Sequence, residues 1–152
     1  MEEQKVLARW QRQCSKAEYC SADVFRKALK ALDGDREAAA RVVASLVKDR
    51  FVDDARYASA YARERASIQG WGPVKIRFQL RAKGISEASI AAALSEVEPE
   101  KASDKLDRLL SAKARTLAGD PQYRLKLLKF GLSRGYDYDQ VEASLERIKN
   151  NS

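Results

Sequence analysis

The chain repeats itself at an interval of 51 residues, and this periodicity restricts the folds open to it more than any other feature. Three segments align without gaps: SADVFRKALKALDGDREAAARVVASL from Ser21, GPVKIRFQLRAKGISEASIAAALSEV from Gly72 and YRLKLLKFGLSRGYDYDQVEASLERI from Tyr123. Apolar residues recur in register, for example Phe25, Ile76 and Leu127. We therefore divide the 152 residues into three repeats, 1–50, 51–98 and 99–152, that form one continuous structural unit.

Each repeat is expected to contain three helices, because apolar residues recur every three to four positions and no segment alternates as a half-buried strand does. The first helices are expected at 4–15, 53–69 and 104–118, the second at 22–32, 73–83 and 121–134, and the third at 35–48, 87–97 and 138–149. The predicted fold class is all-α, a tandem array of three three-helix repeats, elongated and able to curve, because units of this size share faces with their neighbours.

One turn position is common to the three repeats. Asp33, Gly84 and Gly135 occupy it, and a glycine that follows a basic residue is typical of a helix C-terminus. In the third repeat Gly131 stands where the other repeats have leucine, which indicates either a weakened helix or a close approach of another segment.

Composition excludes most enzyme classes. The sequence has no histidine, no phosphate-binding glycine loop and only two cysteines, Cys14 and Cys20, which we expect to be reduced and packed as small apolar residues. We therefore expect neither catalysis nor a metal or cofactor. The chain also lacks a long apolar run and a signal-peptide pattern, which predicts a cytoplasmic protein.

Two adjacent carboxylates, Asp53 and Asp54, are the one arrangement that resembles a catalytic or metal-binding pair. A structural interpretation is favoured. Asp53 is expected to be an N-cap, Asp54 to lie at the positive end of the helix dipole, and Val52 to pack on Tyr57 across the first turn.

Positive charge is concentrated in the second helices. The formal net charge is +7 and the sequence pI is about 9.5, values that favour a polyanionic partner. Against a single acid, Asp23, these segments carry eleven cations: Arg26, Lys27, Lys30, Lys75, Arg77, Arg81, Lys83, Arg124, Lys126, Lys129 and Arg134. The alternative is a set of solvated faces without a specific partner.

Helical geometry sharpens the expectation for 73–83. At 100° per residue, Ile76 and Leu80 point to one side and Val74 and Phe78 to the other, which predicts a helix packed on both sides. Arg77 and Arg81 then share one exposed strip, from which arginine can form bidentate pairs with carboxylates or phosphates.

The stretch QGWGPVKIRFQLRAKG, residues 69–84, contains the residues expected to begin and end this helix. Gly72 is expected to cap its start, Pro73 to take the first helical position and Gly84 to end it. For Trp71 two interpretations remain open: packing against the preceding helix, which we favour, or a platform on which a nucleic-acid base stacks.

The middle repeat resembles a known family. FVDDARYASAYARER from Phe51, followed by GWGPVKIRFQLRAKGIS from Gly70, is similar to the signature of the RecX family, bacterial regulators of the RecA recombinase. The matching residues are Val52, Asp53, Asp54, Arg56, Tyr57, Arg63, Arg65, Gly70, Trp71, Gly72, Lys83 and Gly84. RLKLLKFGLSRGYDYDQVEASL resembles the C-terminal repeat of the family, whereas the first repeat matches less closely.

This resemblance implies a small helical protein of three repeats that binds in the groove of RecA filaments formed on single-stranded DNA. We also expect a monomer without a cofactor, and direct contact with DNA, which the sequence leaves open, is at most weak. It further implies that the protein limits filament extension, ATP hydrolysis, strand exchange and SOS co-protease activity. The residues expected to make contact are Arg63, Arg65, Lys75, Arg77, Arg81, Lys83, Arg124, Lys126, Lys129 and Arg134. The alternative is a helical repeat protein that binds nucleic acid directly, with its cations on phosphates.

Overall fold

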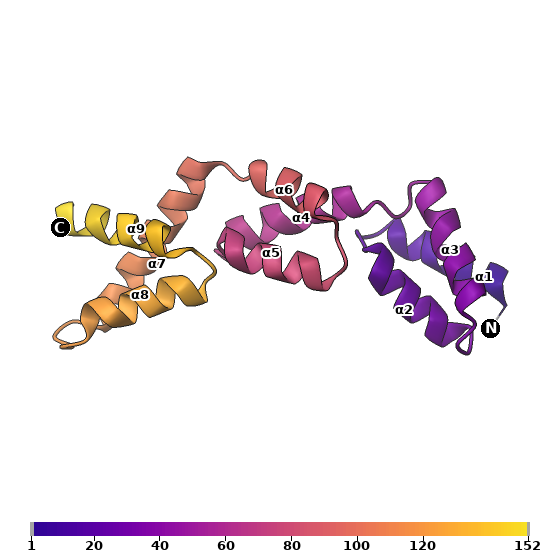
Figure 1. The fold of residues 1–152 in the computed structure, drawn as a ribbon, viewed down its shortest axis with the longest axis horizontal. Helices are drawn as coiled ribbons and strands as arrows, with labels where there is room; N and C mark the ends of the chain where they lie inside the picture. Colours follow the sequence, from indigo (N-terminus) through magenta and orange to yellow (C-terminus); the bar gives the residue numbers. More distant parts are fainter. Residues whose placement is uncertain (1, 152) are drawn as a thin grey trace. The chain divides into compact units, whose positions relative to one another are not determined.

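A computed structural model describes residues 2–151, and within that range the chain forms nine α-helices and no β-strand (Figure 1). The helices are α1 Glu3–Cys14, α2 Ser21–Ala31, α3 Arg36–Lys48, α4 Asp54–Ser67, α5 Pro73–Ala82, α6 Glu87–Ser95, α7 Pro99–Thr116, α8 Tyr123–Ser133 and α9 Tyr138–Asn150. The predicted all-α fold class is confirmed. None of the helices in this range is long and apolar enough to cross a lipid bilayer.

The expected helix limits agree with the observed ones to within a few residues, with one larger error. Helix α7 begins at Pro99 and not at 104, because Glu98 has an extended backbone and Pro99 takes the first helical position, where its missing N–H costs nothing. Helix α8 begins two residues later than expected, since the Asp120 side chain accepts the Gln122 N–H at 2.8 Å and holds the preceding residues in a turn.

The turn shared by the three repeats has the same backbone conformation each time. Asp33, Gly84 and Gly135 have φ angles of +56°, +76° and +97°, the left-handed region that ends many helices. Aspartate is one of the few other residues that tolerate this region, so the first repeat keeps the turn without a glycine at this position.

Residue contacts divide the chain into two compact units. One comprises Met1–Ala60 with Leu80–Ile90, and the other comprises Tyr61–Gln79 with Ala91–Ser152. The boundary therefore passes through α4, α5 and α6.

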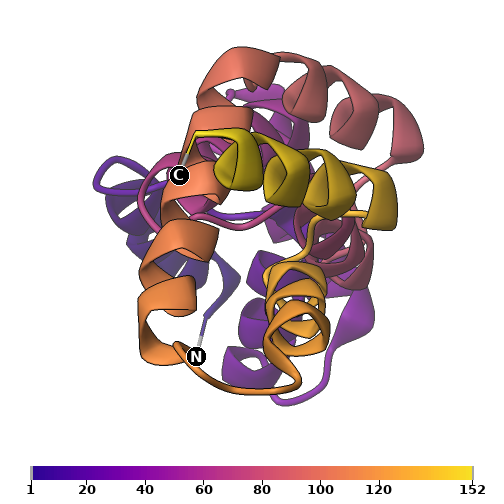
Figure 2. The ribbon, with the colours of Figure 1, turned by 90° about the vertical axis from the view of Figure 1, so that its left-hand side faces the viewer.

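In the first unit α1, α2 and α3 enclose an apolar core. Val6, Val24, Val42 and Leu46 are fully buried there, and Trp10 packs edge to face on a neighbouring tyrosine. The second unit has a core between α7, α8 and α9, the orange and yellow helices of Figure 2. Its buried apolar residues are Leu106, Leu110, Leu127, Tyr136, Val141 and Leu145.

The start of α5 lies in direct backbone contact with the turn between α8 and α9. We call this contact, between residues 72–75 and residues 134–135, the backbone crossing. The Gly72 N–H donates to the Arg134 carbonyl at 2.8 Å, and the Val74 N–H donates to the Gly135 carbonyl at 2.9 Å. A Cβ on Gly72 would lie 2.4 Å from the Gly135 carbonyl carbon, and one on Gly135 would lie 2.3 Å from the Lys75 Cβ. Gly72 thus starts the helix as expected, but backbone carbonyls from a distant turn replace a side-chain cap.

Close packing also explains why residue 131 is a glycine. A Cβ at this position would lie 2.7 Å from a methyl group of Val141, so the glycine lets α8 and α9 approach each other closely. Of the two interpretations open from the sequence, the structure supports the close approach.

The adjacent carboxylates Asp53 and Asp54, together with Arg56 that follows them, make polar contacts that hold the first unit together. Asp53 caps α4 as predicted, since its side chain accepts the Arg56 N–H at 3.1 Å. Asp54 accepts both the backbone N–H and the hydroxyl of Ser21, at 2.8 and 2.7 Å, and so links the start of α4 to the start of α2. Arg56 pairs with Glu18 at 2.5 Å and donates to the carbonyls of residues 50 and 51.

A second link in this unit joins Lys83 to Asp23, with 2.9 Å between Nζ and the carboxylate. Hydrogen bonding to Asp23 raises the pKa of Lys83. Partial burial alone would raise the pKa of Asp23, but the hydrogen bonds from Lys83 and Cys20 outweigh it and the net shift is downward.

We expect Gly135→Ala to destabilise the protein far more than Gly119→Ala. Both glycines have positive φ, at +97° and +81°, so both substitutions carry a backbone cost of about 1–2 kcal/mol. Only Gly135 is crowded, and its added methyl group forces the crossing with α5 apart, which should bring the loss to at least about 3 kcal/mol. Urea unfolding measures the difference, and equal losses would show that the crossing is not tight.

We expect Lys83→Met to reduce the free energy of unfolding by about 0.5–1 kcal/mol at pH 7, because both partners of the ion pair are half-buried and solvent screens their attraction. The lowered pKa of Asp23 contributes stability above its unfolded value and loses it as pH falls through the folded value. The difference from wild type should therefore shrink between pH 7 and pH 3, whereas Lys5→Met, on exposed α1 surface, should show no such trend.

Candidate interaction surface

The ten cations expected to make contact are distributed over three helices and the residues next to them. Helix α4 carries Arg63 and Arg65; α5 and its C-terminal turn carry Lys75, Arg77, Arg81 and Lys83; α8 and its C-cap carry Arg124, Lys126, Lys129 and Arg134. Arg81 and Lys83 belong to the first compact unit, and the other eight belong to the second.

Half of these cations pair with acidic side chains. Besides Lys83 with Asp23, the pairs are Arg63 with Glu96 at 3.6 Å, Arg81 with Glu87 at 2.5 Å, Arg124 with Glu142 at 2.5 Å and Lys126 with Asp120 at 2.6 Å. The Lys126 ammonium lowers the pKa of Asp120, and the hydrogen bond that Arg81 donates to Glu87 raises the pKa of Arg81. Acids contributed by other segments therefore neutralise much of the charge that the sequence concentrates on the second helices.

Two further cations lie against aromatic rings. The Arg65 guanidinium is 4.6 Å from the centre of the Tyr61 ring and 5.3 Å from that of Trp71, and Lys75 Nζ is 4.5 Å from the Trp71 ring. Tyr61 and Trp71 pack edge to face with their centroids 6.3 Å apart. Trp71 therefore packs against α4, the interpretation favoured from the sequence, and its ring carries two cations that compete with any stacked base.

Arg134 is engaged at the backbone crossing. Its Nη2 donates to the Gln69 carbonyl, its own carbonyl accepts from Gly72, and its Nε is buried without a hydrogen-bond partner in the described part of the chain. The Nε of Arg65 is buried in the same way. These contacts favour a structural role for both arginines.

Two of the ten cations have no acidic partner, no aromatic contact and no side-chain hydrogen bond to the backbone within residues 2–151: Arg77 on α5 and Lys129 on α8. Arg77 is half-buried and Lys129 is exposed. Both belong to the second compact unit.

The outer face of α5 differs from the expectation. Ile76 and Leu80 are buried, but 48% of Val74 and 68% of Phe78 is exposed, so the prediction of a helix packed on both sides is wrong. Helical periodicity gives the two apolar directions correctly, yet packing covers only one of them.

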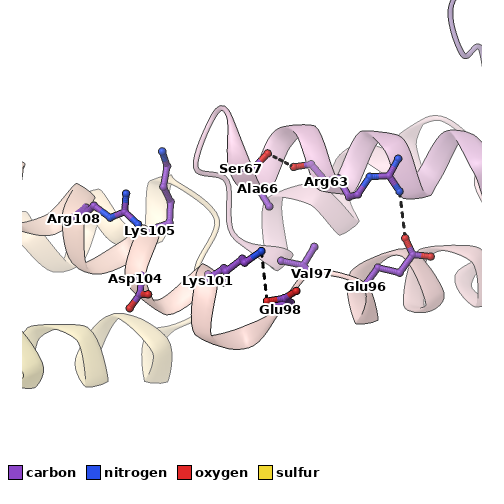
Figure 3. A pocket seen from close by; sticks show the side chains of 11 residues that line it. Arg63, Ala66, Ser67, Glu96, Val97, Glu98, Lys101, Asp104, Lys105 and Arg108 are labelled. Carbon is purple, nitrogen blue, oxygen red and sulfur yellow. Dashed lines mark hydrogen bonds and ion pairs between the residues drawn. The ribbon is translucent and has the colours of Figure 1, made fainter.

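The second unit also contains a groove of about 530 Å³ between the end of α4 and the start of α7 (Figure 3). Its walls carry Arg63, Lys101, Lys105 and Arg108 together with Glu96, Glu98 and Asp104. Lys101 lies 3.6 Å from Glu98, whereas Lys105 and Arg108 have no acidic partner in the described range, and Figure 3 shows both extending from the same side of α7. The sequence analysis did not include these α7 cations, because it took its candidates from the family signature and from the second helices of the repeats.

Comparison with known proteins gives consistent results. The family model described as RecX, second three-helix domain, matches residues 53–94. Proteins named Regulatory protein RecX are similar to this chain: that of Clostridium perfringens (strain 13 / Type A) is 33% identical over 115 residues, covering 73% of this chain and 53% of the relative. That of Bacillus mycoides (strain KBAB4) is 31% identical over 111 residues, covering 72% and 41%. The chain thus spans about half the length of these relatives.

Solved structures agree with the sequence matches. A crystal structure of regulatory protein RecX aligns with a TM-score of 0.84 and 26% identity, covering 97% of this chain and 71% of that one. The crystal structure of RecX from Lactobacillus salivarius aligns over 97% and 96% of the two chains with a TM-score of 0.85 and 21% identity, a likeness of fold. With the signature residues in place and a matching fold, this chain belongs to the RecX family of regulatory proteins.

Proposed function

We propose that this protein regulates the RecA recombinase by binding in the groove of RecA filaments on single-stranded DNA. Binding would limit filament extension and with it ATP hydrolysis, strand exchange and SOS co-protease activity. Membership of the RecX family supports the regulatory role, and the partner follows from what the family signature implies.

The observation that carries the proposal is the small set of cations on α5 and α8 in the second unit that internal acids leave unneutralised. Helix α5 has no acidic residue between Pro73 and Ala82, and Arg77 and Lys129 have no internal acidic partner in the described range. An unpaired cation can bind a carboxylate or a phosphate without first giving up an internal ion pair. Arg81, Arg124 and Lys126 would each have to exchange their partner first.

Direct binding to nucleic acid is the second candidate, and the net charge of +7 favours it. The contacts around Trp71 weigh against it, because Arg65 and Lys75 already lie on its ring. A filament bound to DNA offers protein carboxylates as well as phosphates, and the guanidinium of Arg77 can pair with either.

We expect Arg77→Glu with Lys129→Glu to reduce the affinity for RecA filaments on single-stranded DNA by at least about tenfold, equivalent to about 1.4 kcal/mol. The cause is the reversal of two unpaired charges on the binding surface. Fluorescence anisotropy of labelled protein, with filaments and with naked single-stranded DNA at several salt concentrations, measures the change.

The matched control is Lys5→Glu with Arg9→Glu, an equal charge reversal at two exposed positions of α1 outside the proposed surface, which should leave filament affinity unchanged. The proposal would be refuted if wild-type protein bound naked DNA and filaments equally, with a steep salt dependence and no effect on RecA ATPase. That outcome would support the direct nucleic-acid binder.

A further inference from the structure

Helix α5 presents an apolar pair to solvent. Phe78 is 68% exposed and Val74, one turn before it, is 48% exposed, while Ile76 and Leu80 on the opposite face are 1% and 0% exposed. Residues four apart lie on the same face of a helix, so the two side chains form one apolar patch. Such a patch on an otherwise charged helix typically marks a contact with another molecule.

The repeat shows that the fold does not require this patch. At the position of Phe78 the first and third repeats have Lys27 and Lys129. At the position of Val74 the first repeat has Asp23 and the third has Leu125, which is 46% exposed. The first repeat therefore folds with charged residues at both sites, and the third with one at the Phe78 position. An aromatic residue that packing does not demand calls for another explanation.

The positive charge around the patch indicates that its partner carries negative charge. Lys75 and Arg77 flank it within the second unit, no acid occurs on α5, and Arg77 has no acidic partner in residues 2–151. An aromatic anchor with an arginine at its edge is the usual composition of the energetically dominant part of a protein interface. Its complement is an apolar pocket bordered by carboxylates.

A membrane surface and a single strand of nucleic acid fit this face less well. Helix α5 buries its opposite face and has its start bound to the Gly135 carbonyl, so it presents only two apolar side chains instead of the broad apolar face of an interfacial helix. Single-strand binding uses several aromatic rings in succession, and here one ring stands beside an aliphatic side chain.

We propose that Val74 and Phe78 are the apolar anchor of the interaction surface, and that they insert into an apolar, carboxylate-rimmed pocket on a protein partner. This inference rests on the proposed function, under which the pocket lies on the RecA filament. In this arrangement the flanking cations guide association and set orientation, whereas the apolar pair slows dissociation.

The test compares Val74→Ala/Phe78→Ala with Tyr138→Ala. Tyr138 is a matched control because it is also an exposed aromatic residue of the second unit, at 56%, but lies between Asp137 and Asp139 and so lacks a cationic rim. With stopped-flow measurement on RecA filaments, the double variant should lose affinity by about tenfold or more, mainly through faster dissociation. Its salt dependence and thermal unfolding should match wild type, and Tyr138→Ala should bind normally.

The outcomes separate the two proposals. If wild-type protein does not bind filaments, the proposed function fails and the anchor fails with it. If wild type binds and the double variant binds equally well, only the anchor is refuted. The anchor is also refuted if wild type sediments as a dimer that the substitutions dissociate, or if they abolish binding to naked single-stranded DNA or to phosphatidylserine vesicles.

Discussion

The backbone crossing between Gly72 and Gly135 is the contact on which the second unit depends. Two hydrogen bonds, donated by Gly72 just before α5 and by Val74 in its first turn, are accepted at the turn between α8 and α9, and no side chain fits between the two segments. The same contact explains why the helix start needs no side-chain cap. It also orients the neighbouring side chains, because Trp71 precedes the crossing, Lys75 follows it, and Arg134 belongs to it.

Much of the fold could be predicted from the sequence, because the 51-residue repeat shows each helix and turn in three aligned segments that can be compared with one another. The left-handed turn at Asp33, Gly84 and Gly135 and the Asp53 cap are local, so local sequence suffices to predict them. Helix α7 is the exception, because the 51-residue repeat predicts its start at residue 104 whereas Pro99 begins the helix.

Contacts between distant segments could not be predicted in the same way. Periodicity identified the two apolar sides of α5, but only the structure shows that Phe78 has no covering segment. The hydrogen bonds from Ser21 to Asp54 join residues far apart in the chain, and no local sequence pattern predicts them. For the candidate site the cations could be located from sequence, whereas the acids that neutralise Arg81 and Arg124 come from other helices.

The internal ion pairs change how the net charge of this protein should be understood. Association with a polyanion weakens with salt in proportion to the number of cations that displace condensed counterions. A lysine such as Lys126, already held by Asp120, displaces few, because its own carboxylate partner must be released at the same time. A surface with many cations but few unpaired ones can therefore bind with a shallow dependence on ionic strength, and shape and apolar contact then determine where it binds.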